Sequence, residues 1–167
     1  MALFPPGKGG GEGVDYGYKG KGVTSHLLVD GNGMPLSVSS TSASGSERDQ
    51  VSVLLYRVRV YHGYGRPRRC PHEIHADKGY DSRVLRIFLR AKGIRPVIPK
   101  RTWKEKRRSV GRRIPASKSR WNVERCFSWM QRKYRRLVAR WERRNSYWEG
   151  FLELAIIMIW VDRLICG

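Results

Sequence analysis

Acidic residues are scarce in this chain. Of its 167 residues, 14 are Asp or Glu and 34 are Lys or Arg, so the formal net charge is +20 and the isoelectric point is near 10.7. This imbalance excludes the neutral or acidic surface of a typical metabolic enzyme. It favours a polyanionic partner, of which nucleic acid is the simplest.

Paired cysteines and long apolar runs are also lacking. Cys70, Cys126 and Cys166 lie far apart in the sequence and form no Cys-x-x-Cys motif, which argues against a disulfide framework and against a zinc knuckle. A reducing cytoplasm is therefore the expected compartment. The longest apolar run, 154–161, is far shorter than a membrane span, so no membrane partner is expected.

Aromatic residues, in contrast, are plentiful. Six Trp, eight Tyr and four Phe are too many for a disordered basic tail, and the length suits a single domain. Residues 100–144 hold 18 basic and three acidic side chains, a net of +15 (18 − 3), interleaved with Trp121 and Trp129 among other aromatic residues. We interpret this segment as a folded phosphate-binding surface. A merely solvated charged face is the alternative.

The first third of the chain predicts a hairpin followed by a helix. The Gly-rich segment 1–22 lacks the spacing of a phosphate-binding loop and is interpreted as a flexible loop. Strands are expected over 24–30 and 34–41, joined by the turn Asp30-Gly-Asn-Gly, in which Asp30 is better explained as a turn residue than as a metal ligand. A helix over 47–61 would have Ser46 as its N-cap. Its spacing buries four residues: Val51, Leu54, Leu55 and Val58.

The middle of the chain predicts a strand, a helix and a second strand. The first strand covers 73–77 and ends at Asp77, a helix begins at Asp81, and the second strand covers 94–98. The expected buried stripe of this helix consists of Val84, Leu85, Phe88 and Leu89. Together with the hairpin, this order indicates an α/β layered domain.

The last third predicts a basic linker and two helices. Residues 99–116 form the linker, and the C-terminal helices cover 117–141 and 146–165. The first helix would place Trp121, Phe127, Tyr134, Leu137 and Val138 on its apolar side. The second half of the last helix is nearly all apolar, so we expect it to be buried.

Two acids stand where chemistry could occur. Asp77 closes a strand, and sites in α/β sheets form at the carboxyl ends of strands, although a turn or cap residue is an equal alternative. Glu124 lies within a helix, where an ion pair with Arg120 is the alternative. If the two carboxylates meet, oxygen ligands of this kind suit Mg²⁺ or Mn²⁺. Such ions activate a hydroxyl for attack on a phosphodiester.

Other catalytic arrangements have weaker support. The string Cys70-Pro-His72-Glu-Ile-His75 contains zinc-type ligands, but His72 and His75 would fall on opposite faces of a strand. The nucleophile elbow Gly-x-Ser-x-Gly of a serine hydrolase does not occur in the sequence.

Several sequence motifs are specific for one protein family when they are taken together and in order. They are His26-Leu-Leu-Val-Asp-Gly-Asn-Gly-Met-Pro-Leu36, His75-Ala-Asp-Lys-Gly-Tyr-Asp-Ser82, and Asn122-Val-Glu-Arg-Cys-Phe-Ser-Trp129 followed by Tyr134-Arg-Arg-Leu137. With them, nearly the whole chain resembles the DDE-type transposases of bacterial insertion sequences. The resemblance implies a ribonuclease-H-like (retroviral-integrase-like) mixed sheet flanked by helices. It also implies a Mg²⁺ or Mn²⁺ site that cleaves DNA at insertion-sequence ends and transfers the strand.

The resemblance also assigns roles to residues. Asp77 matches the second catalytic acid and Glu124 the catalytic glutamate, both as metal ligands. On the helix of Glu124, Arg120 matches the family arginine, whereas Ser117 stands where Tyr is usual and Gln131 where Lys is usual. The expected DNA-binding residues are Lys78, Arg120, Arg125, Gln131, Arg132, Lys133, Arg135 and Arg136.

The first acid of the family has no match. The family places it just before a segment like Phe4-Pro-Pro-Gly, which corresponds to about Met1 here, and neither Asp15 nor Asp30 fits the motif. We therefore expect residues 1–167 to form one partial catalytic domain without its first core strand, from a truncated or second-frame transposase. Whether this chain alone is an enzyme stays open.

The expected partners follow from the same resemblance. They are DNA ends and target DNA, the upstream transposase part, and further copies of the chain in a homo-oligomeric active complex associated with the nucleoid. The alternative is a non-catalytic basic nucleic-acid-binding protein, either a transposase remnant or an RNA-binding module.

Overall fold

The predicted hairpin lies at the centre of the fold. A computed structural model describes residues 2–61, 63–101 and 120–166. In it, β3 (Gly20–Val29) and β4 (Pro35–Ser42) pair antiparallel, with Leu27 opposite Val38. The connecting turn is held by the Asp30 carboxylate, which accepts hydrogen bonds from the amides of Asn32 at 2.9 Å and Met34 at 2.8 Å. The interpretation of Asp30 as a turn residue is confirmed.

The Gly-rich segment is more ordered than a flexible loop. Two short strands, β1 (Ala2–Leu3) and β2 (Asp15–Gly17), pair antiparallel with β3 and complete a four-stranded main sheet. Between them, the amide of Lys8 donates to the carbonyl of Arg140 at 2.8 Å. The flexible-loop interpretation is wrong because backbone pairing holds the segment in place, over a long range for β1 and as a local hairpin with β3 for β2.

Helix α1 (Gln50–Arg57) follows the hairpin but begins later than expected. Its N-cap is Asp49, without a side-chain capping bond, and residues 47–49 form a turn, so the prediction of Ser46 as N-cap is wrong. The buried face is confirmed, since all four of its predicted residues are buried: Val51, Leu54, Leu55 and Val58.

The predicted strand–helix–strand unit forms a second, two-stranded sheet. Strands β5 (Glu73–His75) and β6 (Arg95–Val97) pair in parallel and are connected through η1 (Lys78–Tyr80) and α2 (Arg83–Ala91). Leu85 and Leu89 of α2 are buried as predicted, but Val84 is 77 % exposed. Val84 was misplaced because α2 contacts the protein along one narrow side only.

The C-terminal helices are α3 (Arg120–Lys133) and α4 (Asn145–Cys166), with the short η2 (Arg135–Leu137) between them. Most of the basic linker and residues 117–119 lie outside the described residues. Helix α3 ends before Tyr134, whose backbone is not helical, so the predicted continuation to residue 141 is wrong. Trp121 and Val138 were expected on the apolar side, yet they are exposed.

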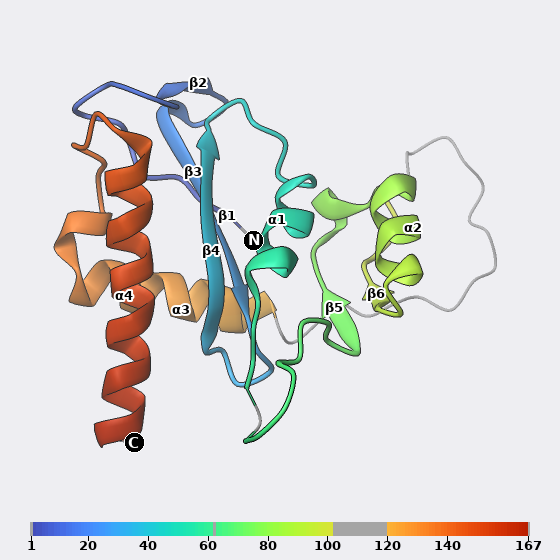
Figure 1. The fold of residues 1–167 in the computed structure, drawn as a ribbon. Helices are drawn as coiled ribbons and strands as arrows, with labels where there is room; N and C mark the ends of the chain where they lie inside the picture. The colour runs from blue at the N-terminus through green and yellow to red at the C-terminus, as the bar shows by residue number, and fades with distance from the viewer. Residues whose placement is uncertain (1, 62, 102–119, 167) are drawn as a thin grey trace.

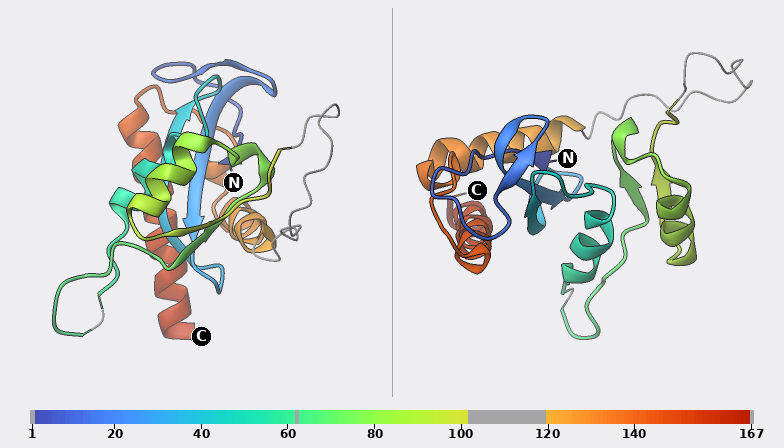
Figure 2. Two further views of the ribbon diagram at one scale, coloured as in Figure 1. Left: turned by 90° about the vertical axis from the view of Figure 1, so that its right-hand side faces the viewer. Right: turned by 90° about the horizontal axis from the view of Figure 1, so that it is seen from above.

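The elements form layers around the main sheet. Figure 2 shows α3 and α4 on one face of the β3–β4 hairpin, with α1 and then β5, β6 and α2 on the other. One core joins Leu27 and Val38 of the hairpin to Phe127 of α3 and Trp148 of α4. A second core joins α1, β5, α2 and β6 around the fully buried Leu89. A mixed α/β architecture is therefore confirmed (Figure 1).

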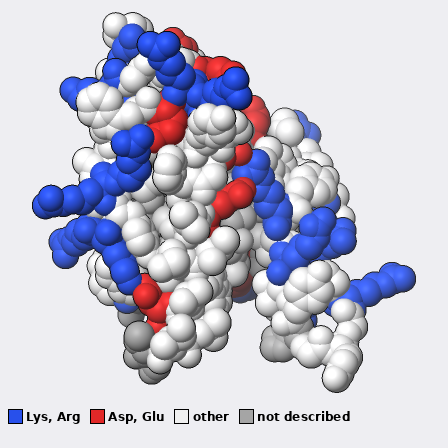
Figure 3. All heavy atoms as spheres, turned by 60° about the vertical axis from the view of Figure 1, so that its left-hand side comes forward, with Lys and Arg blue, Asp and Glu red and all other residues white. Residues whose placement is uncertain are grey.

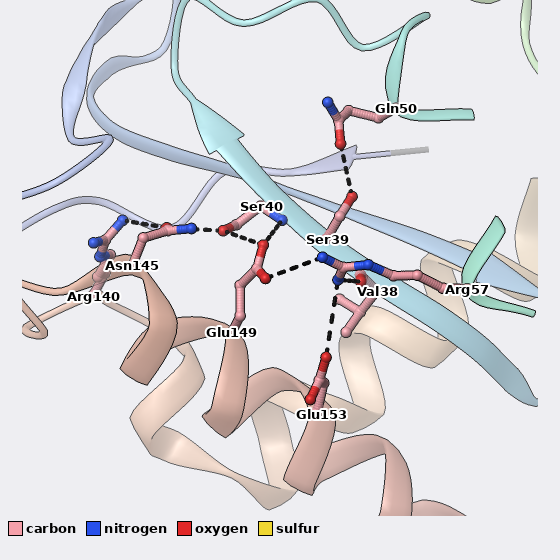
Figure 4. A network of polar contacts seen from close by, with 9 residues as sticks. All are labelled: Val38, Ser39, Ser40, Gln50, Arg57, Arg140, Asn145, Glu149 and Glu153. Carbon is pink, nitrogen blue, oxygen red and sulfur yellow. Dashed lines mark hydrogen bonds and ion pairs between the residues drawn. The ribbon is translucent and has the colours of Figure 1, made fainter. Parts of the chain in front are cut away.

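Helix α4 is fixed to β4 by a polar network near its N-terminus (Figure 4). The Glu149 carboxylate accepts a hydrogen bond from the amide of Ser40 at 3.0 Å and forms an ion pair with Arg57 at 3.3 Å. Arg57 also donates to the carbonyl of Val38 at 2.6 Å, and Asn145 bridges Ser40 to Arg140. These contacts determine which side of α4 faces the sheet.

The predicted burial of the second half of α4 is wrong. Its inner side is buried through Leu152 and Ile159, but Leu154, Ile157 and Leu164 are exposed. A helix that is apolar all round needs partners all round, and in the described residues the main sheet covers one side only. No helix of the described ranges is long and apolar enough to cross a membrane.

Candidate active site and nucleic-acid surface

A cleft separates the main sheet from β5. The cavity has a volume of about 790 Å³, and its lining includes residues 26–29 of β3, residues 73–76 in and after β5, and parts of α1. On the side of β3 away from β4, β1 and β2 pair only with residues 20–22, 25 and 26. Within the described ranges, β5 pairs only with β6. Two strand edges without a sheet partner in these ranges thus border the same cleft.

Both predicted catalytic acids lie next to residues that line this cleft. Ala76 precedes Asp77 and Val123 precedes Glu124, and both Ala76 and Val123 belong to the cavity lining. Asp77 follows β5 directly, and its carboxylate accepts a hydrogen bond from the amide of Gly79 at 2.7 Å. Its role as a cap is therefore observed, and the capping bond uses one of its two carboxylate oxygens. Glu124 is half-buried on α3.

The described residues do not complete a metal centre. Among them, no group of three His, Cys, Asp or Glu side chains is arranged to hold an ion. Carboxylate oxygens are the donors that Mg²⁺ and Mn²⁺ prefer, so the chemistry of Asp77 and Glu124 fits such an ion. A third ligand of the same kind would have to come from outside the described ranges.

Charge interactions are strong at the rim of the cleft. Glu73 on β5 accepts a hydrogen bond from His75 at 2.7 Å and is also bound by Arg95. These two partners lower the pKa of Glu73 to about 2. On the cavity wall, burial raises the pKa of the Tyr80 hydroxyl. Glu73 therefore stays ionised at any physiological pH, and its charge is already neutralised by neighbours.

Arg125 has a structural role in the described fold. Its guanidinium lies over the rings of Trp121 and Trp129, 4.3 and 4.9 Å from their centroids, and donates to the carbonyl of Asn32 at 2.9 Å. Asn122 adds a hydrogen bond to the carbonyl of Gly31 at 2.9 Å. These contacts attach α3 to the turn of the hairpin, and so they position Glu124 at the cleft.

The other predicted DNA-binding residues fall into two groups. Lys133 pairs with Asp162, and Arg136 pairs with Glu142 at 2.7 Å, so part of their charge is used within the chain. Gln131 is half-buried, and three further residues are exposed: Lys78, Arg132 and Arg135. The side chain of Arg120 lies outside the described residues.

The sequence interpretation missed one basic surface. A pocket of about 500 Å³ beside α2 is lined by six residues: Asp81, Arg83, Arg86, Ile87, Arg90 and Lys100. Arg86 is held by Asp81, at 2.7 and 2.9 Å. The signal was present in the sequence, since arginines at 83, 86 and 90 follow helical spacing and share one face.

Comparison with known proteins decides the family. The family model described as "Transposase DDE domain" matches residues 4–160. The chain belongs to this family of transposase DDE domains. The match includes the cleft, both predicted acids, helices α1 to α3 and the larger part of α4.

Two relatives carry insertion-sequence names. A Burkholderia cepacia protein named as a transposase for insertion sequence element IS402 is 37 % identical over 139 residues, which are 83 % of this chain and 62 % of the relative. A Brucella ovis protein named as a transposase for element IS6501 is 29 % identical over 146 residues, 81 % of this chain and 95 % of the relative. The chain thus spans about six tenths of the Burkholderia relative. No solved structure matches.

Proposed function

We propose that this transposase-family chain takes part in DNA transposition, with Asp77 and Glu124 as ligands of the catalytic metal. The observation that carries the proposal is the placement of both acids beside one cleft within a DDE family match. The reaction is cleavage and strand transfer of DNA phosphodiesters at insertion-sequence ends. Mg²⁺ or Mn²⁺ would activate the attacking hydroxyl and stabilise the leaving oxygen.

The cleft itself suggests how the site becomes complete. A strand inserted between residues 27–29 of β3 and β5 would pair with both edges and join the two sheets into one mixed, ribonuclease-H-like sheet. Such a strand, supplied by an upstream transposase part, would bring its own acid to the end of β5, where Asp77 lies. This accounts for a family member in which the described residues form no group of three metal ligands.

DNA would bind through exposed cations around the cleft. Lys78 follows β5, Arg132 lies in the last turn of α3, and Arg135 begins η2. The pocket beside α2 adds Arg83 and Arg90. Contacts of this kind hold the phosphate backbone without selecting a sequence, and the binding should weaken steeply as salt is raised. Such a protein would be associated with the nucleoid.

The test is cleavage of a duplex that carries an end of the encoding element, in Mg²⁺ and with the polypeptide encoded upstream supplied. Asp77→Asn and Glu124→Gln should each reduce cleavage at least a thousandfold, because loss of one ligand removes the metal. The control is Asp49→Asn, an exposed acid outside the cleft, which should cleave like the wild type. Full cleavage by both site variants would show that the site assignment is wrong. DNA binding without metal-dependent cleavage by the complete assembly would identify a non-catalytic protein.

A further inference from the structure

Helix α4 carries a second apolar side that the main sheet does not cover, although the guanidinium groups of Arg136 and Arg144 lie over the rings of Phe151 and Tyr147 at its N-terminal end. Six residues form this surface, which we call the α4 seam: Tyr147, Phe151, Leu154, Met158, Val161 and Ile165. Each is between 38 % and 77 % exposed. Ile157 and Leu164 widen the seam on one flank and are exposed as well. The residues are not scattered, because all of them lie on one 22-residue helix.

The spacing of the seam is that of a coiled coil. Its members follow one another at intervals of four, three, four, three and four residues, which is the alternation of core positions in a heptad repeat. The seam extends over most of a helix about 33 Å long. The buried side of α4 has the same spacing in Trp148, Leu152, Ala155 and Ile159, so the spacing shows that the seam is a second continuous helix face beside the one that packs on the sheet.

The charges around the seam argue against DNA as its partner. No Lys or Arg belongs to it, although the chain carries a net charge of +20. Helix α4 has three acids and one base, a net of −2 (1 − 3). All three acids are paired within the chain, Glu149 and Glu153 with Arg57 and Asp162 with Lys133. Figure 3 shows the resulting uncharged area over α4 between groups of charged side chains.

The exposed area suits association with another protein surface. The six seam residues with Ile157 and Leu164 expose roughly 900 Å², whereas a standard interface takes ~800 Å² from each partner. The largest apolar patch of a monomeric protein is about 300–600 Å². A surface of this size and shape is complementary to a second helix with the same spacing, and α4 of another copy is such a helix.

We propose that the α4 seam pairs with the α4 seam of a second copy of this chain, as an antiparallel two-helix coiled coil. In the antiparallel register centred on residue 156, each aromatic side chain meets a smaller β-branched one, with Tyr147 opposite Ile165 and Phe151 opposite Val161, and Leu154 lies opposite Met158, which is of similar volume. A parallel register would instead place like aromatic residues against each other. The proposal rests on the exposed seam and not on the catalytic assignment, so each can fail without the other.

Sedimentation of the full chain tests the interface. The wild type should be a dimer, and Leu154→Glu should weaken the dimer at least a hundredfold, because it would bury a charge in the seam. The control is Val84→Glu, which replaces an exposed apolar residue on α2 and should leave the dimer intact. Circular dichroism should show unchanged helix content in both variants, since neither residue is buried. A monomeric wild type, or a Leu154→Glu dimer as stable as the wild type, would overturn the proposal.

Cross-linking tests the direction of pairing. In a background in which Cys70 and Cys166 are replaced by Ser, chains carrying Leu154→Cys and chains carrying Met158→Cys are oxidised separately and as a mixture. The antiparallel register predicts disulfide-linked dimers in the mixture and few in either chain alone. Efficient cross-linking of each chain with itself and no gain in the mixture would contradict it. If Leu154→Glu disrupted the dimer only in the presence of DNA, the result would also contradict the proposal, because direct pairing of the two α4 seams does not need DNA.

Discussion

Acidification should weaken the fold through one buried histidine. His26 is 1 % exposed in β3; its Nε2 lies 2.8 Å from the Thr41 hydroxyl, and its Nδ1 has no hydrogen-bond partner in the described part of the chain. Burial lowers the pKa of His26 to about 4, from an ordinary value of 6.5. The imidazole must therefore stay neutral in the folded protein, whereas the unfolded chain accepts a proton more readily.

The sign and size of the effect follow from this difference. The stabilising contribution of neutral His26 is complete above pH 6.5 and is lost progressively as the pH falls towards 4. Between about pH 7.5 and about pH 5, the free energy of unfolding should fall by about 2 kcal/mol. Glu73 and Asp81 also have lowered pKa values, but these carboxylates remain ionised in both states over most of that range. Their contribution is lost at lower pH.

Urea unfolding at a series of pH values measures the effect. His26→Gln keeps a hydrogen-bonding group and cannot be protonated, so its unfolding free energy should change little between about pH 7.5 and about pH 5. His72→Gln, at an exposed histidine, should behave like the wild type. If His26→Gln loses as much stability as the wild type over this range, the buried imidazole is not the cause and the reasoning is refuted.

Three further substitutions test the packing, each by urea unfolding. Arg140→Lys should cost about 2–4 kcal/mol, because the buried guanidinium donates to three acceptors on two segments that one ammonium cannot reach together. An unfolding free energy of Arg140→Lys equal to that of the wild type would contradict this prediction. Gly9→Ala should cost about 1–3 kcal/mol, since its Cβ would lie 2.1 Å from the carbonyl oxygen of Trp141, whereas Gly31→Ala meets no atom within 4 Å and should be neutral. Leu89→Ala should cost about 3 kcal/mol as a fully buried side chain; a loss below 1 kcal/mol would show a loosely packed second core.

Local patterns predicted most elements of this fold. The hairpin was predictable because Asp30 and its glycines specify a tight turn between two alternating strands. The face of α1 was predictable from the helical spacing of Val51, Leu55 and Val58. The ends of the helices were predicted less well. Whether Ser46 caps α1 and whether the helix continues through Tyr134 depend on backbone conformation, which contacts with the rest of the fold determine. Strand β1 was missed because its pairing partners lie 22 to 24 residues away, whereas β2 was missed although it pairs with residues only 3 to 7 positions away.

The candidate site was predictable in its residues but not in its surroundings. Asp77 and Glu124 were selected from their motifs, and the structure adds the cleft that Ala76 and Val123 line beside them. The partners of Arg125, Lys133 and Arg136 could not be predicted, because each depends on a segment brought close only by folding.

The sequence alone determined the polyanionic partner class, the family resemblance, the central hairpin and the strand–helix–strand unit, because charge, motif order and periodicity are local properties of a chain. The tertiary structure decided three things that are not local. It left a cleft between two strand edges, it neutralised some arginines and lysines while leaving others exposed, and it covered one apolar side of α4 and not the other. The physical reason is the same in each case. The sequence determines which charged, polar and apolar groups the chain carries, but neighbours distant in the chain determine whether those groups already have partners in the fold.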